Sequence, residues 1–207
     1  MKLHLGCGEK YLKGYLNIDY SRSKHTVQQK AVADKFADIL DLKYPPGSIS
    51  EIRLHHVFEH FSRVVACMLL TRWYGWLKPG GVLRIEVPDF ETMAKIITSP
   101  FSFSKQKDKA VRHIFGSQEA SWATHFTGYT RPSLKNLVEL FGFRVTEIRK
   151  NSWRGTHNIE LFAVRKERII TPKQFEKIAE KYLSCFLIDN SVTEKRLLKI
   201  WMEKYHD

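Results

Sequence analysis

Residues 3–19 read LHLGCGEKYLKGYLNID and decide how the N-terminal half folds. An apolar run leads into Gly6-Cys7-Gly8, and Asp19 closes the next apolar run. Glycines after a strand let the main chain approach a ligand closely, because they carry no Cβ. An acid at the end of the following strand can accept hydrogen bonds from ribose hydroxyls. The stretch therefore predicts two parallel strands joined by a ligand-binding turn.

The spacing of these residues does not fit a dinucleotide. That fingerprint needs GxGxxG and an acid about 20 residues further on. Here GCG is followed by Glu9-Lys10-Tyr11, and Asp19 lies 11 residues after Gly8. The cradle for a pyrophosphate is therefore poor, and a nucleoside without phosphates fits better. GCG alone is equally consistent with an ordinary tight turn.

The composition predicts one domain with a full core and an appendage, since the 207 residues are 43% hydrophobic and 27% charged. No apolar run reaches the roughly 18–20 residues of a membrane span, and we expect no signal peptide. Cys7, Cys67 and Cys185 lack CxxC spacing, which argues against a disulfide framework and predicts a reducing, cytoplasmic location. The net charge of +12 favours anionic partners, although a solvated lysine-rich surface explains it equally well.

Strand and helix patterns alternate along most of the chain. Strands are predicted at 2–6, 15–19, 36–40, 50–56 and 82–87, helices at 62–77, 91–98, 105–114 and 131–141, and a strand hairpin at 143–149 and 159–165. This order predicts an α/β fold, an open, mostly parallel twisted sheet with helices on both faces and a C-terminal antiparallel hairpin. Ligands of such sheets bind at the carboxyl ends of the strands. The first crossover is short, so we expect at most about one helical turn there.

Four segments resemble, in the right order, the class I S-adenosylmethionine-dependent methyltransferases. They are KLHLGCGEKYLKGYLNID at 2–19, ADILDLKYPPGSISEIRLHHVFEHF at 37–61, LKPGGVLRIEVPDF at 77–90 and HFTGYTRPSLKNLVELFGFRV at 125–145. The likeness is greatest to a small bacterial-type group associated with cell-surface glycan assembly, and it covers residues 2–166. It implies S-adenosylmethionine as cofactor, S-adenosylhomocysteine as product, and no metal. The short first crossover departs from the pattern of most members.

The resemblance also implies a set of cofactor contacts. In it, Gly6, Cys7 and Gly8 line the methionine part, Asp19 holds the ribose, Asp38 meets the adenine amino group with Ile39 beside it, and His55 and His56 flank the methionine end. Two alternatives stay open. Asp19 could simply cap a turn, and Asp41 competes with Asp38.

The letters HVFEH at 56–60 also match HxxEH, a zinc-protease signature. Zinc binding by that motif needs both histidines on one helix and a distant third ligand. Here the motif directly follows a strand, so we place His56 at the strand end. Glu59 and His60 then read as a helix-start pair, with Glu59 stabilised by the helix dipole. We therefore expect no metal site.

Residues 90–131 follow the fifth strand and are expected to cover the substrate side of the pocket. Within them, HIFGSQ at 113–118 and HFTGY at 125–129 resemble stretches of the same group. We predict His125 as the general base, since histidine titrates near working pH; a loop-bonding histidine is the alternative. Asp89, Gln118 and Tyr129 are candidate substrate-binding residues, although Tyr129 fits the core equally well.

The sequence is consistent with three functions. The first is O-methylation of a glycan, a sugar or another small hydroxylated acceptor. The second is RNA methylation, which the charge of +12 favours but the absence of [DN]PP[YF] opposes. The third is a non-catalytic binding subunit that keeps the cofactor fold.

The C-terminal residues lie beyond the resemblance. We divide the chain into a methyltransferase domain at 1–166 and a helical extension at 167–207. Apolar residues recur at helical spacing in the extension, which predicts packing faces against the domain or against a second subunit in a homodimer. Its lysines and arginines suggest, as a further alternative, peripheral contact with an anionic membrane.

Overall fold

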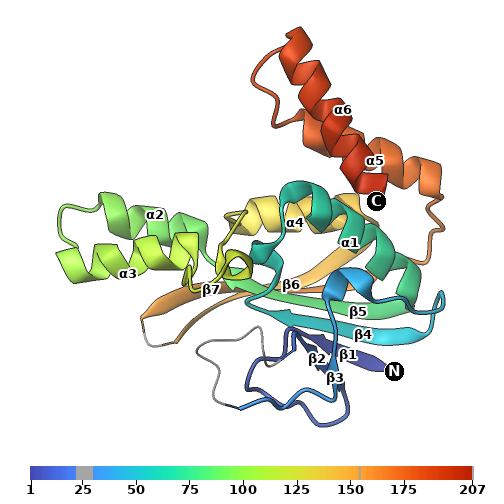
Figure 1. Ribbon diagram of the computed structural model, residues 1–207, viewed down its shortest axis with the longest axis horizontal. Helices are drawn as coiled ribbons and strands as arrows, with labels where there is room; N and C mark the ends of the chain where they lie inside the picture. The colour runs from blue at the N-terminus through green and yellow to red at the C-terminus, as the bar shows by residue number, and fades with distance from the viewer. Residues whose placement is uncertain (22–29, 154, 207) are drawn as a thin grey trace.

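The computed structural model describes residues 1–21, 30–153 and 155–206. Its strands form one seven-stranded sheet in the order β3-β2-β1-β4-β5-β7-β6 (Figure 1). The strands are β1 (Lys2–Leu5), β2 (Leu16–Asp19), β3 (Lys35–Phe36), β4 (Ile49–His55), β5 (Leu77–Pro88), β6 (Phe143–Trp153) and β7 (Thr156–Arg165). Pairs among β1 to β5 are parallel, while β7 is antiparallel to both β5 and β6. The predicted fold class, with its C-terminal hairpin, is confirmed.

The crossover from β1 to β2 is as short as the sequence indicated. Residues 6–15 form turns without a helix, and Leu3 pairs with Leu16 in parallel register. The turn closes because the main-chain N–H groups of Gly6 and Cys7 both donate to the carbonyl of Ile18, at 2.9 and 3.1 Å. The glycine turn is thus fixed on the end of the neighbouring strand rather than on a helix.

The third strand is shorter than predicted. We expected a strand at 36–40, but β3 ends at Phe36 and Ile39–Asp41 forms the 3-10 helix η2. Asp38 causes the change, because its carboxylate accepts a hydrogen bond from the Leu40 N–H and so caps the helix.

The helices largely match their predicted ranges. They are α1 (Arg63–Trp76), α2 (Phe90–Thr98), α3 (Ser104–Phe115), α4 (Arg131–Leu140), α5 (Pro172–Ser184) and α6 (Val192–His206), with further 3-10 turns η3 (Phe58–His60) and η4 (Ser121–Ala123). Ser62 caps α1 through the Val65 N–H. The turn-forming residues Lys78-Pro79-Gly80-Gly81 follow α1 and lie inside β5, and the pairing of β5 with β4 shifts register there, between Ile49 and Glu51.

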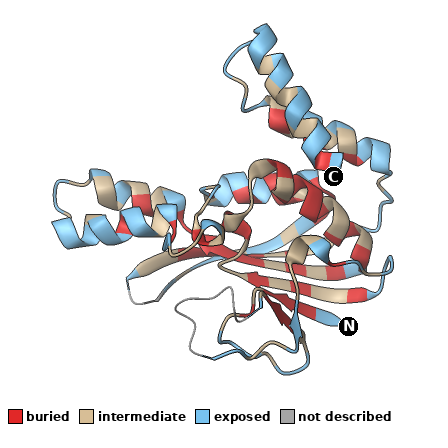
Figure 2. Cartoon of the chain, in the orientation of Figure 1, coloured by how far each residue is buried: buried red, intermediate tan, exposed pale blue. Residues whose placement is uncertain are grey.

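The two faces of the sheet differ in character. One is apolar, with fully buried residues such as Ile52, Leu54, Leu83 and Ile85, and α1 and α4 lie over the same side of the sheet in Figure 1. Figure 2 shows the buried residues concentrated along the strands and α1. Residues alternate between faces along a strand, so the neighbouring positions form a polar face. Its members include His4, Arg53, His55, Arg84, Glu86 and Glu160.

The extension packs on the domain. Phe175 of α5 is buried against Tyr74 of α1, with ring centroids 5.0 Å apart, and the hydroxyls of Tyr205 and Thr71 are 2.8 Å apart. The division at residue 166 stays a prediction. At the start of α6 the Ser191 hydroxyl accepts from the Glu194 N–H, while the Glu194 carboxylate accepts from the Ile188 N–H.

Candidate active site

A cavity of about 1250 Å³ opens at the carboxyl ends of the parallel strands. It is bounded by the glycine turn, by the ends of β2 and β4, and by the polar face of the sheet. Its lining includes Gly6, Cys7, Gly8, Asp19, Tyr20, Ile39, Arg53, His55, His56, His60, Arg84, Glu86, His113, Trp122, Phe126, Asn158 and Glu160. Of the predicted cofactor contacts, only Asp38 lies outside this lining.

The glycine turn needs glycine at both positions for different reasons. Gly6 has φ +66°, and a Cβ there would lie 2.2 Å from a methyl of Val57. Gly8 has φ +55°, but a Cβ there would meet nothing within 4 Å. The left-handed conformation favours glycine in both cases. At Gly6 close packing against Val57 is a second reason for glycine. Gly8 instead faces open space in the cavity wall.

Asp19 links this turn to the second strand. Its Oδ2 accepts the Gly8 N–H at 2.6 Å, and its Oδ1 accepts the Tyr20 N–H at 2.7 Å. The side chain is 7% exposed and reaches the cavity. Beside it, burial and the charge of Asp19 raise the pKa of the Cys7 thiol to about 12. Cys7 is therefore a neutral wall residue rather than a nucleophile.

Asp38 was predicted to contact the adenine, but it lies outside the cavity lining. Its Oδ2 accepts a hydrogen bond of 3.1 Å from the Tyr20 hydroxyl, and its Oδ1 caps η2. Tyr20 and Ile39 line the cavity in its place, with the Trp122 ring 6.3 Å from the Tyr20 ring. Asp38 thus holds the aromatic and aliphatic surface in position. Tyr20 was not singled out from the sequence, although its place directly after Asp19 was a usable signal.

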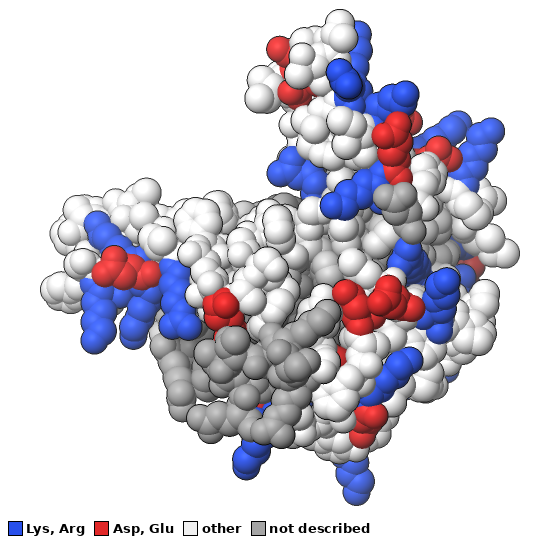
Figure 3. Space-filling view, in the orientation of Figure 1, with Lys and Arg blue, Asp and Glu red and all other residues white. Residues whose placement is uncertain are grey.

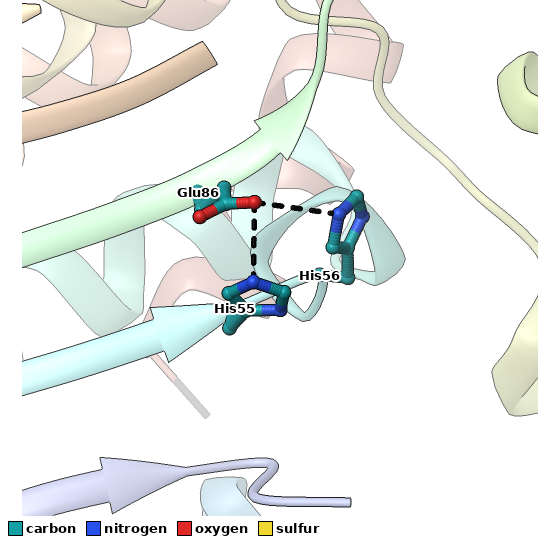
Figure 4. A group of neighbouring side chains, drawn as sticks. All are labelled: His55, His56 and Glu86. Atoms are coloured by element: carbon teal, nitrogen blue, oxygen red, sulfur yellow. Dashed lines mark ion pairs between the residues drawn. The ribbon is translucent and has the colours of Figure 1, made fainter. Parts of the chain in front are cut away.

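Histidines and acids gather where β4 ends. Figure 4 shows His55 and His56 pointing at Glu86 of β5, with His55 Nε2 at 3.1 Å and His56 Nε2 at 3.7 Å from its Oε1. His56 has φ +54°, and its Nδ1 lies 3.2 Å from Glu59 Oε1. Burial alone would lower the pKa of His56, but the hydrogen bond to Glu59 and the charges of both acids outweigh it and raise that pKa.

His125 lies one layer behind the cavity wall. Its ring is 11% exposed and packs edge-on against His60, a lining residue, with centroids 4.6 Å apart. Its Nδ1 donates to the carbonyl of His113 at 3.1 Å. Burial lowers its pKa, and the nearby Glu59 only partly offsets this. The ring is therefore neutral near pH 7, with its Nε2 lone pair toward Glu59.

The three predicted substrate residues do not reach the cavity. Asp89 is buried, caps α2 through Thr92, and forms an ion pair of 2.9 Å with Lys150. Tyr129 is buried with its ring stacked on Phe58. Gln118 is exposed with φ +57°. Asp89 and Tyr129 also pair as a β-bridge, so they anchor the ends of the 90–131 segment. Their role in substrate binding stays a prediction.

Sequence reasoning did not identify the polar sheet face as part of the site. Arg53, Arg84 and Glu160 line the cavity, and Arg84 forms an ion pair with Glu160. The alternation of charged and apolar residues in RLH at 53–55 and in LRIEV at 83–87 was the available signal. We interpreted it as an ordinary strand pattern.

The lining fits an adenosine-type cofactor. Gly8 leaves open space beside the main chain, and Asp19 offers a carboxylate next to it. Ala37, Ile39 and Leu40 supply an apolar surface for a base. The site offers no glycine-rich helix N-terminus for a pyrophosphate among the residues described, since 6–15 form turns. These features match a nucleoside sulfonium rather than a dinucleotide.

A mostly parallel sheet ending in an antiparallel hairpin, with a glycine turn after β1 and an acid at the end of β2, defines the class I methyltransferase fold. The chain belongs to the methyltransferase domain family, whose model matches residues 4–148. It is thus an S-adenosylmethionine-dependent methyltransferase, and the predicted cofactor and enzyme class are confirmed.

Solved structures share the fold at low identity. A Methanosarcina mazei S-adenosylmethionine-dependent methyltransferase is 15% identical, with TM-score 0.54 over 80% of this chain and 92% of that one. A Haloferax volcanii methyltransferase solved with the Trm112 activator is 14% identical, with TM-score 0.55 over 82% and 83%. A Burkholderia thailandensis 1,6-didemethyltoxoflavin N1-methyltransferase with bound S-adenosylhomocysteine is 13% identical, with TM-score 0.52 over 80% and 70%.

No curated protein matches the sequence at a significant level. Within the part of the chain that the structure describes, no helix combines the length and apolar character that a membrane crossing requires.

Proposed function

We propose that this enzyme methylates a hydroxyl group of a glycan, a sugar or another small hydroxylated acceptor. The size and polarity of the cavity carry the proposal. Pockets for one small ligand commonly have about 300–1000 Å³, whereas this cavity has about 1250 Å³. It can hold a second molecule beside the cofactor, and the wall beyond the glycine turn is the polar sheet face.

The polar wall offers hydrogen bonds that suit a sugar. Arg53, Asn151 and Asn158 project into the cavity from three different strands. Trp122 and Phe126 also line the cavity, and aromatic rings pack well against the apolar faces of sugars. Glycan assembly, as the resemblance implies, provides acceptors of this kind.

The cofactor residues keep their predicted roles in this proposal. Gly6, Cys7 and Gly8 lie along the methionine part, Asp19 binds the ribose, and Ile39 contacts the adenine. S-adenosylmethionine supplies a methyl group on a sulfonium, and much of the enzyme's task is to align that group with the acceptor oxygen. His55 and His56 border this region at the end of β4.

A hydroxyl acceptor must lose its proton as the new O–C bond forms, so a base close to the acceptor oxygen helps. We retain His125 as the proposed base. Its Nδ1 is bound to a carbonyl, which leaves Nε2 with a lone pair. Its ring packs edge-on against the ring of His60, which lines the cavity.

The test is a screen for S-adenosylhomocysteine release over sugars, lipid-linked glycans and RNA. We expect turnover with a glycan or sugar, and Trp122→Ala to raise the KM for that acceptor. Phe101→Ala is the matched control, since Phe101 is 90% exposed and outside the lining. Turnover with RNA alone would overturn the proposal.

RNA is the second candidate, because one surface favours it. Lysines and arginines gather on the hairpin of α2 and α3, next to exposed phenylalanines at its tip (Figure 3). Positive charge beside aromatic rings is a common surface for single strands. Lys105→Glu with Lys109→Glu should abolish turnover of an RNA acceptor and leave a small sugar acceptor unaffected.

A further inference from the structure

Three side chains converge at the cavity wall, where only His60 reaches the lining, although two of them are far from the third in sequence. Glu59 and His60 belong to η3, and His125 follows η4. One ligand atom from each lies within 4.8 Å of the other two. The segments are held together by the carbonyl of Glu59, which accepts the N–H groups of Phe126 and Thr127 at 2.9 and 3.3 Å.

Both histidines are fixed in the form that binds metals. Nδ1 of His60 donates to the carbonyl of Thr124 at 3.2 Å, and Nδ1 of His125 donates to the carbonyl of His113 at 3.1 Å. A carbonyl only accepts, so each neutral ring carries its proton on Nδ1 and a lone pair on Nε2. A metal-bound histidine usually has its other ring nitrogen bound to a carbonyl or carboxylate in this way.

Only one of the two carboxylate oxygens of Glu59 has a hydrogen-bond partner among the residues described. The residue is 1% exposed, and Oε1 lies 3.2 Å from Nδ1 of His56. Oε2 is fully buried and has no hydrogen-bond partner among the residues described. A buried carboxylate oxygen without a partner has lost its water and gained no hydrogen bond in return, which destabilises the fold. A cation bound at Oε2 would remove that destabilisation.

Hydrogen bonding within the group does not account for the arrangement. Nε2 of His125 lies 3.9 Å from Oε1 of Glu59, beyond the range of a hydrogen bond. The carboxylate therefore lies beside the His125 ring without a direct bond to it, and one ligand atom from each of the three residues is still within 4.8 Å of the others.

A neighbouring group provides a contrast. His55, His56 and Glu86 also lie close enough to share an ion (Figure 4). There, however, Oε1 of Glu86 is already bonded to Nε2 of His55 and accepts from Nδ2 of Asn158 at 3.3 Å. The carboxylate oxygen of that group already has hydrogen-bond partners, so His55 serves as a control for metal binding.

We propose that Glu59, His60 and His125 bind a divalent transition-metal ion such as Zn²⁺, with an open coordination position toward the cavity that His60 lines. Two imidazoles and one carboxylate suit zinc and its neighbours better than magnesium. The HxxEH letters thus contribute their last two residues, with His125 as the distant third ligand. This differs from our expectation of no metal, because the sequence does not show that the segment around His125 folds back on η3.

We assign the acceptor hydroxyl as the ligand of the open coordination position. This assignment rests on the proposed function. A metal ion lowers the pKa of a bound hydroxyl. The proton then leaves to water, the oxygen pair forms the O–C bond, and the pair of the broken C–S bond stays on sulfur. In the metal-bound enzyme Nε2 of His125 is a ligand, so the ion replaces the base proposed for the metal-free site.

The experiment uses the full-length chain, stripped with a chelator and titrated with Zn²⁺ or Co²⁺. We expect one equivalent of metal per chain, visible bands of Co²⁺ in a nitrogen and oxygen environment, and a higher Tm after loading. Glu59→Gln, His60→Gln and His125→Gln should each weaken binding by at least about tenfold. His55→Gln should keep it. Circular dichroism checks that each variant is folded.

Absence of binding to the folded wild-type chain, or equal binding by His55→Gln and His125→Gln, would overturn the metal site. Cofactor binding and turnover are measured separately. Metal binding without turnover of any hydroxylated acceptor counts against the proposed function and leaves the site standing. Turnover unaffected by chelation shows that the site does not activate the acceptor.

Discussion

The Gly8 N–H donates a hydrogen bond of 2.6 Å to Oδ2 of Asp19, which ties the turn after β1 to the end of β2. Because residues 6–15 contain no helix, this bond helps to fix how the two strand ends face each other. The carboxylate is positioned by the turn and also borders the cavity. One residue therefore links the architecture of the two strands to the wall of the cavity.

Replacing Asp19 should abolish most cofactor affinity. Asp19→Ala removes the proposed ribose acceptor, and a hydrogen bond to a charged group contributes about 1.5–3 kcal/mol. Calorimetric titration with S-adenosylhomocysteine should show Kd rising by about tenfold or more. The matched control is Asp34→Ala, an acid that accepts the Asn17 N–H at 2.8 Å outside the cavity lining. An equal loss of cofactor affinity in both variants would show that the effect comes from disturbing the β1–β2 region and not from the Asp19 carboxylate itself.

Asp38 and Asp41 should behave differently although Asp38 caps η2 and Asp41 is its last residue. Asp38 caps the helix and holds the Tyr20 hydroxyl, whereas Asp41 is exposed. Asp38→Ala should lower the free energy of unfolding by about 1 kcal/mol and weaken cofactor binding by misplacing Tyr20. Asp41→Ala should stay within about 0.5 kcal/mol. Urea unfolding and calorimetry measure both, and a larger effect at Asp41 would contradict the assignment.

The two glycines of the turn offer a matched pair. Alanine at Gly8 adds only left-handed strain, about 1–2 kcal/mol, because its Cβ meets nothing within 4 Å. Alanine at Gly6 adds the same strain and a contact of 2.2 Å with Val57, so overpacking of about 1–3 kcal/mol is added. Chemical unfolding should rank Gly6→Ala as the more destabilised.

Removing the obstructing methyl groups separates these two effects. In the double variant Gly6→Ala with Val57→Ala, the steric part should be relieved while the strain remains. A cycle over the four proteins should therefore show favourable coupling. Strictly additive losses would mean that Val57 does not limit the turn.

The cysteines should differ in reactivity by position. Burial and the charge of Asp19 raise the pKa of Cys7 to about 12, burial raises that of Cys67 to about 12, and Cys185 is exposed. The thiolate is the reactive form, so iodoacetamide at pH 8 should modify Cys185 alone, as peptide mass mapping would show. In denaturant all three should react. Fast modification of Cys7 in the folded chain would contradict its buried, neutral state.

Much of the fold was predictable because its signals are local. Apolar runs, glycine breaks and capping residues such as Ser62 are read from a few neighbouring residues, and they fixed most element positions. The failure at residues 36–40 was also local in origin. There the side chain of Asp38 competed with strand pairing for the backbone N–H groups, and propensity alone does not weigh that competition.

In the candidate site, too, the predictions from local sequence agree with the structure better than those that depend on distant packing. The residues near the glycine turn lie close in sequence, and the cavity lining contains all the predicted cofactor contacts except Asp38. The substrate-side residues Asp89, Gln118 and Tyr129 fall outside it, because the way a long connection folds depends on packing with distant elements. The polar sheet face was missed since alternation alone does not tell which face a helix covers.

Local sequence accounts for the order of strands and helices, for the turn after β1 and for the acid at the end of β2, because each depends on residues that are near neighbours along the chain. Packing between distant segments places one sheet face along the cavity and brings His125 against Glu59 and His60. Those contacts join segments about 65 residues apart, held by main-chain hydrogen bonds that any sequence can make and that no side-chain pattern reveals.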